Sequence, residues 1–237
     1  MSNYSDAILN GCTNFNRSIL PHDCLLCGAA SGSEPLCPAC HADLPWHRAP
    51  QCPCCALPTT AGELCGQCLQ QAPAFDRTLA VFTYDFPLDA LIQALKYGHQ
   101  LAVLAPLASA LAQQALAAPR PDVLIAMPLH PLRLRERGFN QALELTKIVA
   151  KNLDLPLLPH GAERIRATAP QVGLPWKQRA GNLRGAFACS LDLHGKHVAI
   201  LDDVMTTGTS LHELALTLRQ QGAREISAWV VARTLEK

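Results

Sequence analysis

The chain has 237 residues, a formal net charge of +1 and a hydrophobic content of 49%. This length suffices for a medium domain and a small one around a sizeable core. The near-neutral charge excludes attraction of the whole molecule to nucleic acids or membranes, so any such binding has to be local. The first twenty residues lack the pattern of a signal peptide, which predicts a cytoplasmic protein.

The cysteines form a repeat. A unit of CxxC, nine residues and CxxC begins at Cys24 and again at Cys52. Paired CxxC turns supply the four thiolates that a tetrahedral zinc ion needs, and reduced thiols are the rule without export. We therefore predict two structural zinc ions, one bound by Cys24, Cys27, Cys37 and Cys40 and the other by Cys52, Cys55, Cys65 and Cys68.

The spacing leaves two points about these cysteines open. A cross-braced arrangement, in which the first CxxC shares an ion with the third, has the same spacing, and Cys54 can replace Cys52 or Cys55 as a ligand. We expect Cys12 and Cys189 to be packing residues. Sites closed by four thiolates exclude a catalytic zinc. Arg48 is the sole Lys or Arg between residues 24 and 68, which predicts weak direct DNA binding by the ribbon.

The composition changes after residues 70–74. Strands are predicted at 78–84, 122–129, 197–202 and 225–233, and helices at 88–97, 101–118, 140–152 and 209–221. The segment 97–118 has no Asp, Glu, Lys or Arg, but Pro106 and helical leucine spacing favour a core helix over a membrane span. We predict a double zinc ribbon over 20–72 and an α/β domain with a parallel sheet over 76–237. Ligands of such sheets bind after the strands, here after Met127 and Leu201.

The stretch 198–214 contains the residues that we predict to bind a ligand. Asp202 and Asp203 follow an apolar strand, and a run of Thr, Gly and Ser then begins a helix. Backbone amides and hydroxyls at a helix start suit a phosphate. Carboxylates beside it would repel the phosphate unless they face ribose hydroxyls or a magnesium ion. Together these groups predict a sugar phosphate ligand.

Residues 198–211 resemble the phosphoribosyl-pyrophosphate (PRPP) loop of type I phosphoribosyltransferases. The resemblance implies that Asp202 and Asp203 hold the ribose, with Mg²⁺ accompanying PRPP. Purine-salvage members commonly carry an aspartate where this chain has Thr206, which disfavours hypoxanthine or guanine salvage. The implied ligands of the 5′-phosphate are Thr206, Thr207, Gly208, Thr209 and Ser210.

Further segments extend the resemblance. Leu95-Lys96-Tyr97, residues 127–131, residues 137–141, residues 164–171 with Arg179 and Asn182, and residues 185–187 resemble the competence protein F (ComF/GntX) family. That family joins a double zinc ribbon to a type I phosphoribosyltransferase domain and implies a role in natural transformation or in use of external DNA.

The resemblance also assigns roles around the pyrophosphate. Pro128, Leu129 and His130 are implied to form its loop, and Lys96 to approach it. Arg133, Arg135 and Arg137 are implied to lie in a mobile hood loop that meets the leaving group. The residues expected to act in catalysis are Asp202, Asp203 and Arg137.

Two functions remain open. The first is Mg²⁺-dependent transfer of a phosphoribosyl group to a nitrogen nucleophile, with the acceptor unspecified. The second is a non-catalytic adaptor that binds single-stranded DNA and DNA-uptake proteins. Residues 133–184 hold ten basic residues against four acidic ones, a local excess of six, and Phe139 and Trp176 are candidates for base stacking.

Overall fold

The structure is a computed structural model that describes residues 22–166 and 184–235. The chain divides into two compact units, Met1–Leu44 and Pro45–Lys237. The first unit contains an antiparallel pair, β1 (His22–Asp23) and β2 (Ala30–Gly32), and a short helix, α2 (Pro38–Ala42). The second cysteine repeat therefore belongs to the same unit as the sheet.

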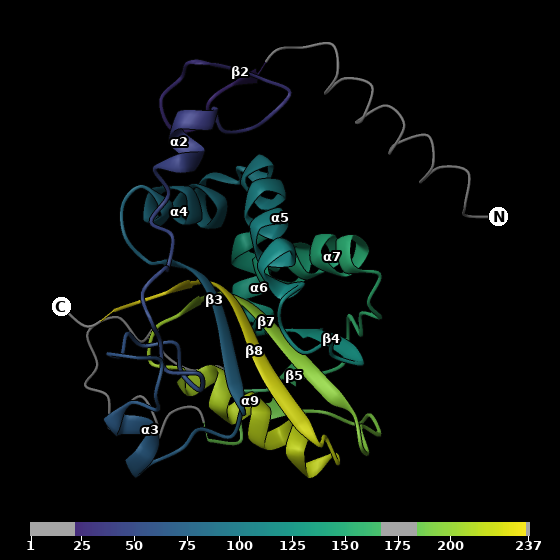
Figure 1. Ribbon diagram of the computed structural model, residues 1–237. Coiled ribbons are helices and arrows are strands. Elements are labelled where there is room, and N and C mark those ends of the chain that lie inside the picture. The colour runs from purple at the N-terminus through teal and green to yellow at the C-terminus, as the bar shows by residue number, and fades with distance from the viewer. Residues whose placement is uncertain (1–21, 167–183, 236–237) are drawn as a thin grey trace. The chain divides into compact units, whose positions relative to one another are not determined.

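A four-stranded sheet forms the centre of the second unit (Figure 1). Its order is β3-β8-β7-β4, and each neighbouring pair is parallel. The continuous apolar runs in its strands explain why it is covered on both faces. The predicted α/β architecture with a parallel sheet is thus confirmed. The strands are β3 (Arg77–Thr83), β4 (Val123–Ala126), β7 (His197–Met205) and β8 (Glu225–Arg233).

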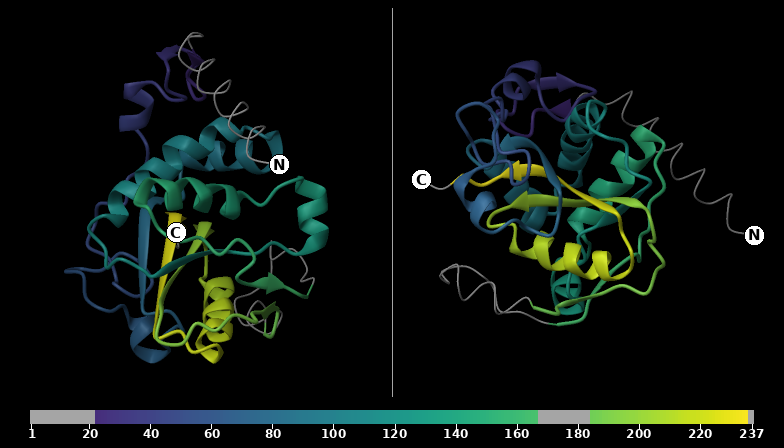
Figure 2. Two further views of the ribbon diagram at one scale, coloured as in Figure 1. Left: turned by 90° about the vertical axis from the view of Figure 1, so that its right-hand side faces the viewer. Right: turned by 60° about the horizontal axis from the view of Figure 1, so that its bottom comes forward.

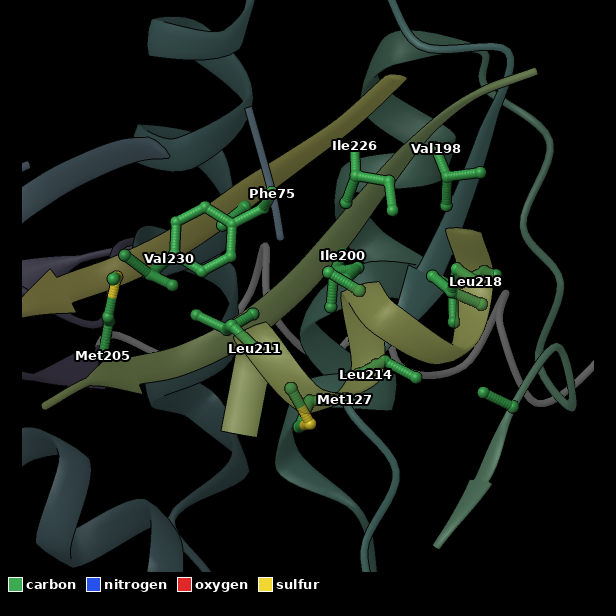
Figure 3. Packing of buried hydrophobic residues seen from close by; sticks show 14 of the residues in the cluster. Phe75, Met127, Val198, Ile200, Met205, Leu211, Leu214, Leu218, Ile226 and Val230 are labelled. Carbon is green, nitrogen blue, oxygen red and sulfur yellow. The ribbon is translucent and has the colours of Figure 1, made fainter. Parts of the chain in front are cut away.

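Helices lie on both faces of this sheet. α5 (Leu104–Ala115) and α7 (Gln141–Leu153) pack against the strands on one face, and α9 (Thr209–Gln220) packs on the other (Figure 2). Alternate strand residues face α9, so Val198 and Ile200 pack near Leu214 and Leu218 (Figure 3). The sheet is consequently the middle of three layers.

The remaining elements are short or precede α5. α4 (Leu88–Gly98) follows β3, and a 3₁₀ turn, η1 (Leu101–Val103), comes before α5, so the helix predicted at 101–118 is two elements. Pro106 stands in the first turn of α5, where a proline lacks no helical hydrogen bond. Beyond these lie α3 (Gly66–Gln70), α6 (Pro131–Arg137), β5 (Glu163–Arg164) and β6 (Phe187–Ala188). In residues 22–166 and 184–235, no helix combines the length and apolar character that a bilayer span requires.

The end of β7 differs from the prediction. The predicted strand 197–202 continues to Met205, so Asp203 lies inside the strand rather than after it. The cause is the unequal length of its neighbours, because β4 pairs with β7 only as far as Leu201, whereas β8 pairs with it to Met205. The stretch from Asp202 onward therefore has one edge free of strand partners among the described residues.

Candidate functional site

The eight predicted zinc ligands form two clusters. Within each cluster, the four Sγ atoms lie within 4.8 Å of one another. A tetrahedral ion with zinc–sulfur bonds of about 2.3 Å separates its sulfurs by about 3.8 Å. The Sγ atoms of Cys27 and Cys37 are 3.8 Å apart, and those of Cys55 and Cys65 are 3.5 Å apart. The clusters fit zinc, and their members are Cys24, Cys27, Cys37 and Cys40 in the first and Cys52, Cys55, Cys65 and Cys68 in the second.

This grouping decides the two points that the spacing left open. Each cluster combines consecutive CxxC turns, so the cross-braced alternative is excluded. Cys54 is not a member of the second cluster. Its Sγ donates instead to the Phe75 carbonyl at 3.7 Å. Cys189 packs against the core, as predicted, and Cys12 lies outside the described residues.

Backbone amides favour the thiolate form of one cysteine in each cluster. Burial opposes ionisation of Cys24, but hydrogen bonds from the backbone of Cys27 and Cys37 lower its pKa to about 6. Cys52 is also buried, and backbone hydrogen bonds from Cys65 and Cys55 lower its pKa to about 7. A thiolate held by amides is the form that binds a metal.

The phosphate loop, residues 206–210, connects β7 to α9. The N-cap of α9 is Gly208, which has no side chain to cap the helix, and the Thr209 amide donates instead to Thr207 Oγ1 at 3.4 Å. Its φ of 77° lies in the left-handed region, and an added Cβ would come within 2.7 Å of Met205 Cε. The hydroxyls of Thr207 and Thr209 are 2.9 Å apart. The predicted anion cradle therefore has a helix amino end, a required glycine and two adjoining hydroxyls.

The acidic pair lies in β7, separated from this loop by Val204 and Met205. Asp203 is buried, and its Oδ2 is 2.5 Å from Lys96 Nζ of α4. Burial opposes the charge on Asp203, but the Lys96 ammonium outweighs it and lowers the pKa of the Asp203 carboxyl. Burial and the neighbouring charge of Asp203 raise the pKa of Asp202 well above its ordinary value. The pair thus favours one charged carboxylate, on Asp203, and one protonated carboxyl.

Gln141, to which the sequence analysis assigned no role, contacts Asp203 together with Lys96. The buried Gln141 side chain forms a hydrogen bond with Asp203 and accepts one from Arg137 Nη1 at 2.6 Å. The Arg137 guanidinium also lies 5.7 Å from the centre of the Tyr97 ring. Arg137, expected to act in catalysis, is therefore connected to the acidic pair through Gln141. No local spacing rule predicts this contact, because Arg137 ends α6 and Gln141 begins α7.

The loop implied for pyrophosphate follows β4. Pro128 is buried, Leu129 is half-buried, and His130 caps α6 through Nδ1, which accepts from the Leu132 amide at 3.3 Å. Asn140 Nδ2 donates to the Met127 carbonyl at 3.1 Å and fixes the start of α7 to the end of β4. These contacts assign His130 a structural role at the helix start.

The prediction of a loop at Arg133, Arg135 and Arg137 is wrong. All three lie on α6, which begins with Pro131 after its His130 cap and ends before Gly138 at a φ of 79°. Arg133 pairs with Glu136 at 2.9 Å, one turn along the same helix. The proline, cap and terminal glycine are ordinary helix signals, and together they favour a helix over a loop.

A further arginine lies near the acidic pair. Arg164, at the end of β5, is half-buried, and burial lowers its pKa while the charge of Asp202 opposes that shift. Arg164 begins one of the segments that resemble the competence protein F family, residues 164–171, but the sequence analysis assigns no role to this arginine. Arg179 and Trp176 of the basic segment lie outside the described residues.

We expect Asp202→Asn to raise the free energy of unfolding at neutral pH by about 1 kcal/mol. The folded protein retains a proton on Asp202 that the unfolded chain releases above its ordinary pKa of 3.8. The contribution of Asp202 to stability therefore falls as pH rises from that value through the raised pKa. Urea denaturation at about pH 4 and about pH 8 measures the gain, which should be larger at the higher pH.

The matched control is Asp203→Asn, which leaves Lys96 without its carboxylate partner and should lower the free energy of unfolding. A gain for Asp202→Asn that is equal at both pH values would contradict a raised pKa for Asp202.

A cavity of about 860 Å³ lies beside the phosphate loop. Its lining includes Thr207, Gly208 and Thr209 from the loop and Cys55 and Cys68 from the second cysteine cluster. The phosphate loop and the second cluster consequently border the same space.

Comparison with known proteins identifies the family of this chain. Residues 15–69 match the double zinc ribbon domain. The chain is 37% identical over 195 residues to DNA utilization protein YhgH of Salmonella typhi, covering 79% of this chain and 86% of that protein. It is 33% identical over 219 residues to competence protein F of Haemophilus influenzae, covering 89% of this chain and 90% of the relative.

Among solved structures, glutamine PRPP amidotransferase from B. subtilis is 20% identical, with a TM-score of 0.36 over 53% of this chain and 26% of its own. The sequence relatives cover most of both chains at more than 30% identity. The chain therefore belongs to the family of competence protein F and DNA utilization protein YhgH.

Proposed function

We propose that this protein binds PRPP with Mg²⁺ in the cytoplasm and acts in DNA uptake or in the use of external DNA. The observation that carries the PRPP proposal is the acidic pair Asp202-Asp203 near the end of β7, the strand that leads through the phosphate loop into the amino end of α9. The names of the relatives, competence protein F and DNA utilization protein, support the role in DNA use. Eight of the ten described cysteines group in the two candidate zinc clusters, an arrangement that needs reduced thiols and supports a reducing compartment.

In this proposal the phosphate loop binds the 5′-phosphate of PRPP. Thr206–Ser210 offer amides and hydroxyls, and the positive end of the α9 dipole favours a doubly charged phosphate. Asp202 and Asp203 accept hydrogen bonds from the two ribose hydroxyls. The bound Mg²⁺ neutralises charge on the pyrophosphate.

The groups around Asp203 would serve the other end of the ligand. Lys96 Nζ is held 2.5 Å from Asp203 and exchanges this partner for a pyrophosphate oxygen when the ligand binds. We place the pyrophosphate also beside Pro128, Leu129 and His130, because they follow β4 at the edge of the sheet where ligands bind. Arg137 remains fixed by Gln141 and directs its charge toward the pyrophosphate.

We infer phosphoribosyl transfer as the reaction. The bond between ribose C1 and pyrophosphate oxygen breaks as a nitrogen nucleophile forms its bond to C1, and the nitrogen releases a proton. Arg137 and Lys96 stabilise the departing pyrophosphate, while Asp202 and Asp203 hold the ribose in place.

A second candidate is a binding protein for single-stranded DNA and for DNA-uptake proteins. The observation that favours it is α6, on which Arg133 and Arg135 are exposed and no residue is buried. Fluorescence anisotropy of labelled single-stranded DNA distinguishes the two functions. DNA binding that PRPP does not displace favours the second candidate, and displacement favours a shared PRPP site.

Ribose 5-phosphate tests the phosphate loop without the groups assigned to the pyrophosphate, because it carries only the 5′-phosphate and the ribose. We expect Gly208→Ala to weaken its binding at least about tenfold, since alanine strains the left-handed backbone of a loop that supplies charge-assisted hydrogen bonds. The shift of the melting temperature with ligand concentration measures the affinity.

The matched control is Gly222→Ala at the other end of α9. Gly222 also has a positive φ, and its Cβ would lie 3.0 Å from His194 Cα, so the substitution strains the same helix away from the loop. Equal losses of affinity in both variants would refute a phosphate site at residues 206–210.

A further inference from the structure

The last residue of β8, Arg233, joins the second cysteine cluster to the phosphate loop. Its side chain is buried, with 4% exposure. Nε donates to the carbonyl of Cys55 at 2.8 Å. Nη1 donates to the carbonyls of Met205, at 3.1 Å, and of Thr206. One guanidinium therefore contacts a zinc ligand of the second cluster and the first residue of the phosphate loop.

The planar guanidinium of Arg233 holds the Cys55 and Thr206 carbonyls at a fixed separation. The guanidinium is planar and its donors are fixed relative to one another. A displacement of the Cys55 carbonyl therefore moves the Thr206 carbonyl or breaks one of the hydrogen bonds. A lysine retains the charge but places one rotatable ammonium where the arginine has two fixed nitrogens.

Apolar packing makes the same connection independently. Phe75 accepts a hydrogen bond from Cys54 Sγ through its carbonyl, and its ring lies 3.7 Å from the Cβ position of Gly208. Phe75 and Met205 pack with Leu211 and Val230 in one core that also contains cysteines of the second cluster (Figure 3). The first cluster belongs to the other compact unit.

We infer that Arg233 is a positioning residue, through which the second zinc site supports the phosphate loop and is itself stabilised when a phosphate ligand binds. The ligand half of this inference rests on the proposed function. Coupling between two binding sites is reciprocal, so zinc in the second cluster and PRPP in the loop each increase affinity for the other. The first cluster is not coupled.

Hydrogen exchange without ligand tests the support of the loop. In Arg233→Gln, we expect the amides of residues 206–211 to exchange at least about fivefold faster than in the wild type, with Arg233→Lys intermediate. Native mass spectrometry verifies that each variant carries two zinc ions. The control is Arg120→Gln, which also removes an arginine bonded to a backbone carbonyl of this unit, that of Asp154 at 2.7 Å, but touches neither Thr206 nor Cys55. Unchanged exchange at 206–211 in Arg233→Gln would overturn the inference.

Cysteine alkylation tests the reciprocal effect in the same molecule. Saturating PRPP with Mg²⁺ should slow alkylation of Cys65 in the second cluster by about fivefold or more and leave Cys40 of the first unchanged. In Arg233→Gln at saturating ligand, the protection of Cys65 should fall, whereas simple shielding by the ligand would survive the substitution. Retained protection would therefore overturn the coupling even if PRPP binds.

The two proposals fail in different ways. If PRPP does not bind the wild type while Arg233→Gln still speeds exchange in the loop, the proposed ligand is wrong and the support of the loop by Arg233 stands. If PRPP binds but neither exchange nor protection depends on Arg233, the proposed function stands and this inference is wrong.

Discussion

Replacing Cys52 with serine should abolish the cooperative unfolding transition of the Pro45–Lys237 unit. Cys52 is fully buried and lies in the core that contains Phe75, Ala80 and Val230. Zinc binding by four cysteines is worth roughly 10–16 kcal/mol in small domains, which matches or exceeds the roughly 5–15 kcal/mol by which a domain is stable. A lost ion and a buried, unpaired hydroxyl leave the unit without that support.

The matched variant is Cys24→Ser in the first cluster, a cysteine that is 3% exposed. It should remove one zinc ion and leave the transition of the second unit in place, because the two clusters belong to different compact units. Circular dichroism melting follows the transitions, and native mass spectrometry counts the ions. A Cys52→Ser protein that retains one zinc and melts as the wild type would contradict this account.

The double substitution Asp202→Asn/Asp203→Asn should weaken PRPP binding by about 10²–10³-fold. Each acidic side chain is expected to accept a hydrogen bond from a ribose hydroxyl, which contributes about 1.5–3 kcal/mol at the charged Asp203 and about 0.5–1.5 kcal/mol at the protonated Asp202. Asparagine preserves the size of each side chain but removes the charge of Asp203. Equilibrium dialysis with labelled PRPP measures the loss directly.

Asp122→Asn provides the control for this loss. Asp122 Oδ2 accepts a hydrogen bond from the His197 amide at 2.7 Å, so it lies at the opposite end of β7 from the acidic pair. Its substitution should leave PRPP affinity within a factor of about two. If both variants lose affinity alike, the acidic pair does not bind the ribose.

Local patterns predicted much of the fold. The last strand, 225–233, has the predicted bounds, and α9 ends one residue before the predicted position. The zinc ligands follow from the CxxC repeat because a CxxC turn presents two sulfurs to one ion regardless of the rest of the chain. Which turns combine depends on tertiary packing, so the choice between consecutive and cross-braced pairs required the structure.

The parts that escaped prediction depend on contacts between distant residues. Lys96 was expected at the pyrophosphate, but its salt bridge with Asp203 joins α4 to β7. Gln141 reaches Asp203 from α7. For Arg233 a signal existed, since a charged residue ends the apolar run of β8 beside the end of β7, where a parallel sheet collects its ligand groups. Its partner Cys55 lies 178 residues earlier, and no periodicity connects them.

Calorimetric titration of the zinc-loaded wild-type protein with PRPP, with and without Mg²⁺, tests the central claim most directly. The account predicts one site with a dissociation constant on the order of micromolar in the presence of Mg²⁺ and weaker binding without it. Absence of binding at ligand concentrations up to about 1 mM would contradict a PRPP site at Asp202, Asp203 and the phosphate loop.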